Sequence, residues 1–416
     1  MHRVMRRGAL VADCVVLWLR FAEAADLDRY CACCRANAAS FRDLRLAIAG
    51  VGPAPPRDAE LRVVCDAPRV GVLAQFLSPL ERRWLVALGR AAATSPVRAR
   101  LRARKLRAKH YVNLDERAFW LPDASRALLR RVGQRVEALT RCPRTADDGF
   151  ELHYTPAGHD ASDAPASPAA AGSTLDAAVW HCAEAGLHVD NNNGFPHRYC
   201  TALAYVNDVE PERGGATVFP CARRDAGAAA PGAGARLLGR SVFHTDTAVN
   251  QDADEALFDD ATDLLARGSR LCLGDVAAEL AGSTVAEPDG SRIAAFGPRG
   301  AGLRVQPRAG ALCVFWSLDG ARGDVDAASW HGGAKVLRRA APRGFWDDGK
   351  WTLQAFKQVP ADARRPGMED ARRRFIRESR TTESGMGGGL RFDVVERRPP
   401  PPRRKERTRE RRRLSS

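Results

Sequence analysis

The sequence lacks any run of about 20 apolar residues, the length that a helix needs to cross a membrane, so we expect no transmembrane span. Its 11 cysteines are too few among 416 residues for a disulfide scaffold, and their spacing fits no closed zinc site. Cys31, Cys33 and Cys34 form a cluster without a second CxxC pair, which we interpret as ordinary thiols or a local disulfide.

The N-terminus leaves two interpretations open. Residues 1–7 carry three arginines, residues 9–19 are mostly apolar, and Ala22-Glu23-Ala24 has the small-residue pattern of a cleavage site. Asp13 and Arg20 interrupt this pattern. A secretory signal would place the protein in the endoplasmic reticulum or the secretory pathway, whereas a first helix or strand of a soluble domain would place it in the cytoplasm.

Outside two segments the chain has no net charge. Residues 98–109 contribute +7 and residues 397–416 contribute +8, which together equal the formal net charge of +15. The first segment has no interleaved aromatic residues for base stacking, so we interpret it as a solvated surface segment. Nucleic-acid contact through the basic tail stays open as the weaker alternative, and the body of the protein needs no polyanion partner.

Two helices are predicted before the main run of strands. Ser78 can cap a helix with Pro79 at its first position, and Glu81 closes a capping box, so this helix should run to about Ala92. A second helix is expected over residues 123–140, where five apolar residues at helical spacing form one stripe.

Short stretches with strand rhythm recur along the rest of the chain. They lie at residues 150–154, 199–209, 303–318 and 351–356. Many short strands with helices at one end indicate a mainly β fold with flanking helices (α+β) and a double-stranded β-helix, or jelly-roll, core.

The predicted catalytic domain covers residues 70–358, after an N-terminal extension at 1–69. It is interrupted by an Ala/Ser/Pro-rich tract at 160–177 and by an insertion at 221–302, which holds a plausible helix at 254–267 and could be a lid, a partner surface or decoration. Residues 359–416 are charged and expected to be a largely disordered tail.

A histidine and a carboxylate two residues apart supply the first sign of chemistry. His188 and Asp190 share one face of an extended chain, so they can bind one divalent metal, and His331 would complete a 2-His-1-carboxylate facial triad. His244 and Asp246 repeat the spacing, but the strand and glycine motifs that follow His188 do not follow them, and we reject this second pair.

The sequence around those residues resembles the catalytic domain of prolyl 4-hydroxylases, a family of Fe(II)- and 2-oxoglutarate-dependent dioxygenases. The matching residues, in the family's order, are Arg198, Thr201, Leu203, Tyr205, Asn207, Asp208, Val209, the segment Gly214-Gly215-Ala216-Thr217-Val218-Phe219-Pro220, Pro307, Gly310, Ala311, Phe315, Trp316, His331-Gly332-Gly333 and Gly349-Lys350-Trp351. Ordered agreement of this kind, over roughly residues 70–358, is more informative than a single short motif.

The resemblance implies an enzyme that hydroxylates peptidyl proline, as procollagen-proline 4-dioxygenases do, with release of succinate and CO2. It implies Fe(II) held by the catalytic residues His188, Asp190 and His331, with 2-oxoglutarate and O2 as co-substrates and L-ascorbate as a further cofactor. Lys350 would bind the distal carboxylate of 2-oxoglutarate, with Lys335 as its rival.

The same resemblance assigns hydroxyl contacts with that carboxylate to Tyr154 and Thr201. It also implies a protein or peptide partner that contains proline. Two other functions stay open: an oxygenase that acts on another protein side chain or on nucleic acid, and a non-catalytic binding module whose insertions block the site.

Overall fold

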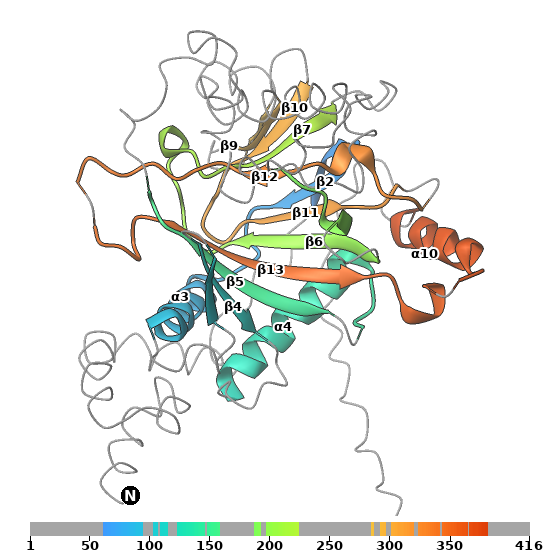
Figure 1. Cartoon of the computed structure of the whole chain (residues 1–416), viewed down its shortest axis with the longest axis horizontal. Coiled ribbons are helices and arrows are strands. Elements are labelled where there is room, and N and C mark those ends of the chain that lie inside the picture. Colours follow the sequence, from blue (N-terminus) through green and yellow to red (C-terminus); the bar gives the residue numbers. More distant parts are fainter. Residues whose placement is uncertain are drawn as a thin grey trace, which may run out of the picture.

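A computed structural model of the chain describes residues 61–94, 103–106, 109–114, 123–145, 148–158, 187–192, 197–223, 284–286, 292–296, 301–319, 323–341, 343–364 and 366–381 (Figure 1). Six features of the sequence fall outside these ranges: the signal-like N-terminus, the cysteine cluster, the tract at 160–177, the His244 and Asp246 pair, the helix at 254–267 and the basic C-terminal segment. None of the helices that the structure describes is long and apolar enough to cross a membrane.

Two antiparallel sheets form the body of the protein. The larger sheet has eight strands in the order β1 (Arg62–Asp66), β2 (Arg69–Leu73), β11 (Leu312–Trp316), β6 (Arg198–Tyr205), β13 (Lys350–Gln358), β5 (Gly149–Thr155), β4 (Lys109–Leu114) and β3 (Ala103–Leu106). The smaller sheet has five strands in the order β12 (Gly332–Gly333), β7 (Thr217–Arg223), β10 (Ala301–Val305), β9 (Arg292–Phe296) and β8 (Thr284–Ala286). Short 3-10 helices lie at Asp190–Asn192, Pro211–Arg213, Ala327–Ser329 and Ala361–Ala363.

The chain passes repeatedly between the two sheets. It runs from β5 in the larger sheet to the β-bridge at His188, which extends the smaller sheet, and then from β6 to β7 and from β11 through β12 to β13. Figure 1 shows β7, β9, β10 and β12 stacked over β6, β11 and β13. Side chains of both sheets, such as Tyr205 and Phe219, share one buried core. The predicted jelly-roll core is therefore confirmed.

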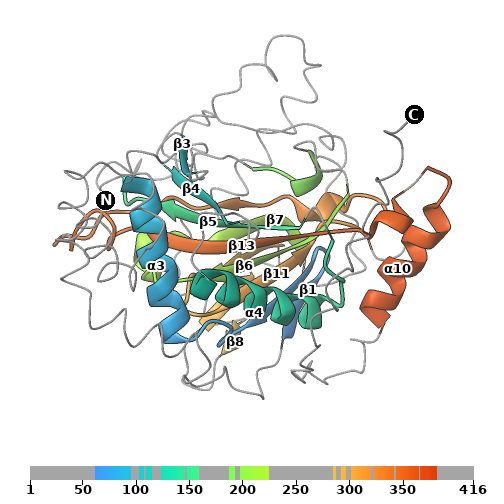
Figure 2. The same cartoon turned by 90° about the horizontal axis from the view of Figure 1, so that it is seen from below.

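Helices α3 (Pro79–Thr94) and α4 (Asp123–Thr140) cover the outer face of the larger sheet (Figure 2). The capping box is formed: the Ser78 amide donates to Glu81 Oε2 over 2.9 Å, and the Glu81 amide donates to Ser78 Oγ over 3.2 Å. Arg135 of α4 donates to Glu81 Oε1 over 2.9 Å and so connects the two helices. Both predicted helices are confirmed, because their caps and apolar stripes are local signals.

Strand β6 is buried on both faces and carries the site at its start. Alternate residues of a strand point to opposite faces. Accordingly Leu203 and Tyr205 belong to the core between the sheets, while Ala202 and Ala204 belong to the core beneath the helices. Thr201 shares the face of Leu203 and Tyr205, so its hydroxyl lies inside the barrel.

The predicted insertion at 221–302 needs a correction. Residues 221–223 complete β7, and β8 and β9, within the supposed insertion, pair with each other and through β9 with β10. Ile293 and Phe296 of β9 lie in the core between the sheets. Burying an apolar side chain of this size stabilises a fold by roughly 1.5–3 kcal/mol, so these strands belong to the fold and are not surface decoration.

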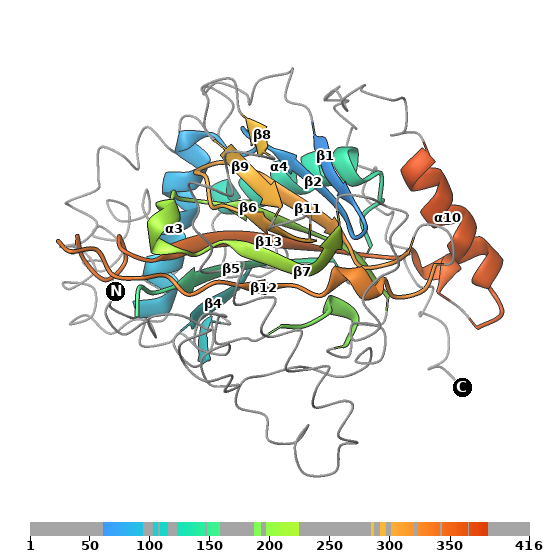
Figure 3. The ribbon, with the colours of Figure 1, turned by 90° about the horizontal axis from the view of Figure 1, so that it is seen from above.

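The two ends of the domain also extend further than the sequence indicated. Strand β1 begins at Arg62, before the predicted boundary at residue 70. Beyond the predicted boundary at 358, helix α10 (Glu369–Thr381) flanks the sheets (Figure 3). Its Ile376 is buried in the core, and the ring centroids of Phe375 and Tyr199 lie 5.2 Å apart. The charged composition concealed an amphipathic helix, because its few apolar residues, Ala371, Phe375 and Ile376, gather on the side that packs against the core.

Candidate metal centre and buried lysine

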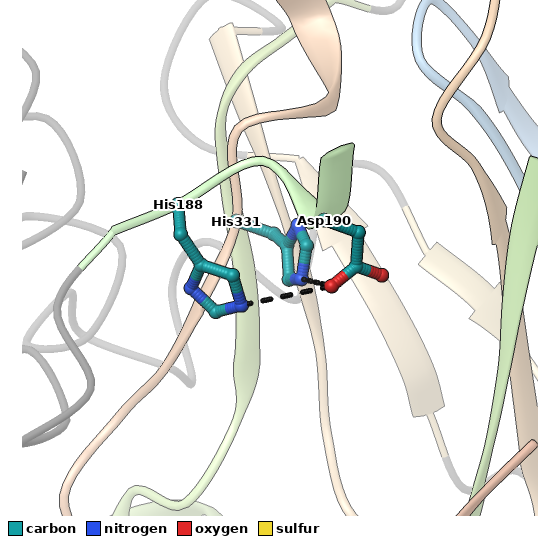
Figure 4. Close-up of side chains that lie close together, drawn as sticks. All are labelled: His188, Asp190 and His331. Carbon is teal, nitrogen blue, oxygen red and sulfur yellow. Dashed lines mark ion pairs between the residues drawn. The ribbon is translucent and has the colours of Figure 1, made fainter. Parts of the chain in front are cut away.

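His188, Asp190 and His331 lie together at one end of the barrel. Nε2 of His188 is 3.8 Å from Asp190 Oδ1, and Nε2 of His331 is 3.9 Å from the same oxygen. Figure 4 shows both imidazoles turned toward this carboxylate. The ligand atoms all lie within 4.8 Å of one another, so the three side chains could hold one metal ion.

Backbone pairing fixes the two histidines side by side. The His188 amide donates to the His331 carbonyl, the His331 amide donates to the His188 carbonyl, and both distances are 2.9 Å. Residues that exchange both hydrogen bonds in an antiparallel pair present their side chains on the same face. The ring centroids consequently lie 4.4 Å apart, although the residues are 143 positions apart in sequence.

A carbonyl group sets the tautomer of His331. Nδ1 of His331 lies 2.9 Å from the Ser329 carbonyl oxygen, which can only accept a hydrogen bond. The proton of the neutral ring is therefore on Nδ1, and Nε2 faces Asp190 with its lone pair. Burial lowers the pKa of His331 although Asp190 opposes this shift, which favours the neutral form that binds a metal.

Asp190 is held in the ionised form by its neighbours. Arg198 Nη1 donates to its Oδ1 over 3.0 Å, and the Thr201 hydroxyl donates to its Oδ2. Burial alone would raise the pKa of Asp190, but the positive charge of Arg198, the two imidazoles and the hydrogen bond hold it at about 2. The guanidinium of Arg198 is itself fixed 3.9 Å from the centre of the Phe356 ring.

The donor set fits a first-row divalent metal such as Fe(II). Two imidazoles and one carboxylate, presented from one side, are the ligands of the facial triad. Three ligand atoms on one face of an octahedron with bonds of about 2.1 Å lie about 3 Å apart. The two nitrogen-to-oxygen separations of 3.8 and 3.9 Å would therefore need to close by about 1 Å, and the three ligand atoms, all within 4.8 Å of one another, by at most about 2 Å, which side-chain rotation can supply.

Aromatic side chains surround the ring of His331 on the barrel side. The Phe315 ring lies 4.4 Å from it and the Phe219 ring 5.8 Å. Both phenylalanines are buried in the core between the sheets. This apolar wall limits the access of water to His331 from the barrel side.

Lys350 lies inside the barrel at the start of β13. Lys350 is only 7% exposed, and its Nζ donates to the Gly215 carbonyl over 2.6 Å. Thr352, two residues along the same face, pairs with Tyr205. The rival Lys335 is half-buried, and its carbonyl accepts from the Gly215 amide over 2.9 Å, so both lysines belong to the same end of the barrel.

The two predicted hydroxyl donors, Tyr154 and Thr201, lie on opposite faces of the larger sheet. Tyr154 pairs with Trp351, packs beneath helix α3 and donates to the Phe345 carbonyl, so it is on the outer face of the larger sheet, away from the barrel. This position gives no support to the predicted contact of Tyr154 with 2-oxoglutarate, which stays a prediction. Thr201 does face the barrel, but its hydroxyl hydrogen is donated to Asp190, which makes it a support of the candidate metal site.

Sequence reasoning missed Tyr205 as a member of the site. Its hydroxyl donates to Thr217 Oγ1 over 2.8 Å inside the barrel, and burial raises its pKa, so it stays protonated. Because Lys350 lies two residues from Thr352, the partner of Tyr205, the phenol and the ammonium group are diagonal neighbours. The signal was present, because Thr201, Leu203 and Tyr205 alternate on one face of β6.

No protein-family model matches the sequence, and no curated protein matches it. Among solved structures, the chain is similar to the viral collagen prolyl hydroxylase vCPH from Paramecium Bursaria Chlorella virus-1, in complex with 2OG, with 11% identity and a TM-score of 0.31 over 71% of this chain and 99% of that chain. A Pseudomonas putida prolyl-4-hydroxylase has 14% identity and a TM-score of 0.30 over 70% and 92% of the two chains.

The non-heme alpha ketoglutarate dependent epimerase SnoN from nogalamycin biosynthesis has 15% identity and a TM-score of 0.32 over 71% and 80%. Similarity at these scores does not indicate the chemistry of this chain. That chemistry is inferred from its own side chains. These three solved structures are thus two prolyl hydroxylases and an alpha ketoglutarate dependent epimerase.

Proposed function

We propose that this chain is an Fe(II)- and 2-oxoglutarate-dependent dioxygenase. The observation that carries the proposal is the convergence of His188, Asp190 and His331 on one point inside a jelly-roll barrel. The buried ammonium group of Lys350 in the same barrel supports it, because a cation in a low-dielectric interior pairs strongly with a carboxylate. A dicarboxylate such as 2-oxoglutarate carries such a group at its distal end.

Each residue then has a defined task. Fe(II), when bound, would supply the chemistry that couples O2 and 2-oxoglutarate to hydroxylation, with succinate and CO2 as products. His188, Asp190 and His331 would hold the metal, while Arg198 and Thr201 keep the carboxylate ionised and oriented.

At the other end of the co-substrate, Lys350 would pair with its distal carboxylate, and the Tyr205 hydroxyl lies within the same region of the barrel. Phe219 and Phe315 would shield the reacting centre from bulk water. A dry surrounding strengthens the ion pair, since a low dielectric reduces the screening of charge.

We further propose peptidyl proline as the substrate and L-ascorbate as the reductant that keeps the metal in its Fe(II) state. The support for both is the ordered sequence resemblance to prolyl 4-hydroxylases, from Arg198 to Trp351. A barrel of this kind does not itself fix the substrate, so the proline assignment needs its own test.

The first experiment tests the binding of metal and co-substrate. Under anaerobic conditions, addition of Fe(II) and 2-oxoglutarate should give the weak visible charge-transfer band of the chelate. His331→Ala should abolish the band. A wild-type protein that binds neither compound would instead support the non-catalytic binding module.

The second experiment tests the substrate. Proline-rich peptides are incubated with the protein, Fe(II), ascorbate and 2-oxoglutarate, and analysed by tandem mass spectrometry. Addition of one oxygen localised to proline, in step with succinate formation, is the expected result. Succinate formation with oxygen on another side chain would retain the oxygenase and reject proline as its target.

A further inference from the structure

The hydrogen-bond ladder between β6 and β13 does not stop where β6 ends. β6 finishes at Tyr205, and the Val206 amide still donates to the Trp351 carbonyl over 2.9 Å. At the next residue a side chain continues the ladder. Asn207 Oδ1 accepts from the Trp351 amide over 2.7 Å, and Asn207 Nδ2 donates to the Gly349 carbonyl over 2.9 Å.

These two hydrogen bonds bracket Lys350 on both sides. The side-chain amide of Asn207 presents a carbonyl acceptor and an NH2 donor in one plane, so it can satisfy a strand edge as a peptide group would. It fixes the main chain before and after Lys350, and therefore the direction in which the lysine side chain leaves the strand. On the opposite edge, Lys350 pairs with Thr155 of β5.

We propose that Asn207 is a positioning residue for 2-oxoglutarate: it fixes the first residues of β13 so that the ammonium group of Lys350 meets the distal carboxylate. This proposal rests on the proposed function and adds a residue to it. Asn207 acts through Lys350 and not by touching the co-substrate.

The segment that leads into β13 ends at a closely packed glycine. Residues 343–348 lead toward β13, and the Asp348 carboxylate accepts from the Arg343 amide over 2.9 Å within this segment. The last residue of this path is Gly349, where a Cβ atom would collide with the Thr155 carbonyl and the Tyr154 ring. The hydrogen bonds from Asn207 to the main chain of Gly349 and Trp351 therefore add to this packing in fixing the path of the chain on both sides of Lys350.

A purely structural role for Asn207 is the competing interpretation, and a double-mutant cycle separates the two. The affinity for 2-oxoglutarate is measured by calorimetry under anaerobic conditions with saturating Fe(II), for the wild type, Asn207→Ala, Lys350→Ala and the double variant. Asn207→Ala should lower the affinity for 2-oxoglutarate by about tenfold and leave the affinity for Fe(II) unchanged. In the Lys350→Ala background it should cause no further loss, because both changes remove the same contact.

Hydrogen exchange at the Trp351 amide reports directly on its hydrogen bond to Asn207. The Trp351 amide should exchange faster in Asn207→Ala, which removes its acceptor. It should keep its protection in Asn207→Asp, which retains an acceptor and loses only the donor to Gly349. Asn207→Asp is nearly isosteric and serves as the second variant where Asn207→Ala does not fold. Asn113→Ala on β4 is the matched control and should change neither measurement.

The outcomes are distinct. Wild-type protein that binds no 2-oxoglutarate would reject the proposed function. If the wild type binds 2-oxoglutarate and both Asn207 variants bind it with the wild-type affinity, the role of Asn207 is rejected while the proposed function stands. A further loss from Asn207→Ala in the Lys350→Ala background would show that Asn207 acts independently of the lysine, and would also overturn this proposal.

Discussion

Removal of the buried ammonium group is the change on which the proposed binding mode depends most directly. Lys350 is 7% exposed, and its Nζ reaches the Gly215 carbonyl over 2.6 Å. In Lys350→Ala the distal carboxylate of bound 2-oxoglutarate would be buried without its partner. Breaking a buried ion pair in this way costs about 3–5 kcal/mol.

That cost predicts a measurable loss. At about 1.4 kcal/mol for each factor of ten, the affinity for 2-oxoglutarate should fall by roughly two to three orders of magnitude. The affinity for Fe(II) should be unchanged, because the three candidate ligands do not include the lysine. Lys350→Arg should restore part of the affinity, since a planar guanidinium does not reproduce a compact ammonium group.

Lys335→Ala is the matched control. Lys335 is half-buried, and a charge in contact with solvent contributes only about 0–1 kcal/mol to an ion pair. Titration of 2-oxoglutarate into the three variants, with Fe(II) and without oxygen, gives the comparison. A large loss in Lys335→Ala together with near-normal binding in Lys350→Ala would refute the reasoning and transfer the role to Lys335.

Three further predictions concern other parts of the molecule. Single changes of His188, Asp190 or His331 to Ala should each abolish Fe(II)-dependent succinate formation and iron binding, since two ligands hold the metal poorly. If a variant keeps both succinate formation and iron binding, the residue changed in it does not belong to the site. Thr201→Val should lower Fe(II) affinity by about 10- to 100-fold, since it removes the hydroxyl that orients Asp190, whereas a selective loss of 2-oxoglutarate affinity would restore the contact predicted from the sequence. Burial raises the pKa of the Cys65 thiol from 9.0 to about 11, so the contribution of the protonated thiol to folding stability should be complete below pH 9 and be lost as the pH rises through 11. Iodoacetamide at pH 8 should label Cys65 only after unfolding, and equal labelling of the native protein would contradict this prediction.

Several elements were predictable from the sequence because their determinants are local. The capping box of Ser78 and Glu81 and the apolar stripe of α4 act within a few residues of the chain, so the bounds of both helices could be read directly. The pairing of His188 with Asp190 was equally local, since residues two apart in an extended chain share a face. The jelly-roll core followed from the number and rhythm of the strands.

Tertiary structure alone decided which faces meet. Strand periodicity groups Tyr154 with Leu152, but only the pairing with Trp351 shows that this group lies under the helices and not inside the barrel. Strands β8 and β9 escaped prediction because they are short and are stabilised by their neighbour β10, so their sequence carries little signal of its own.

The site itself also depends on contacts between distant segments. His331 joins His188 through two backbone hydrogen bonds, and its tautomer is set by the Ser329 carbonyl, neither of which is encoded in the His-Gly-Gly motif. The direction of Lys350 is set by the side chain of Asn207 across the end of β6. A linear motif identifies the residues that carry the chemistry, but the orientation of a side chain is fixed by hydrogen bonds to whichever strands the fold places beside it.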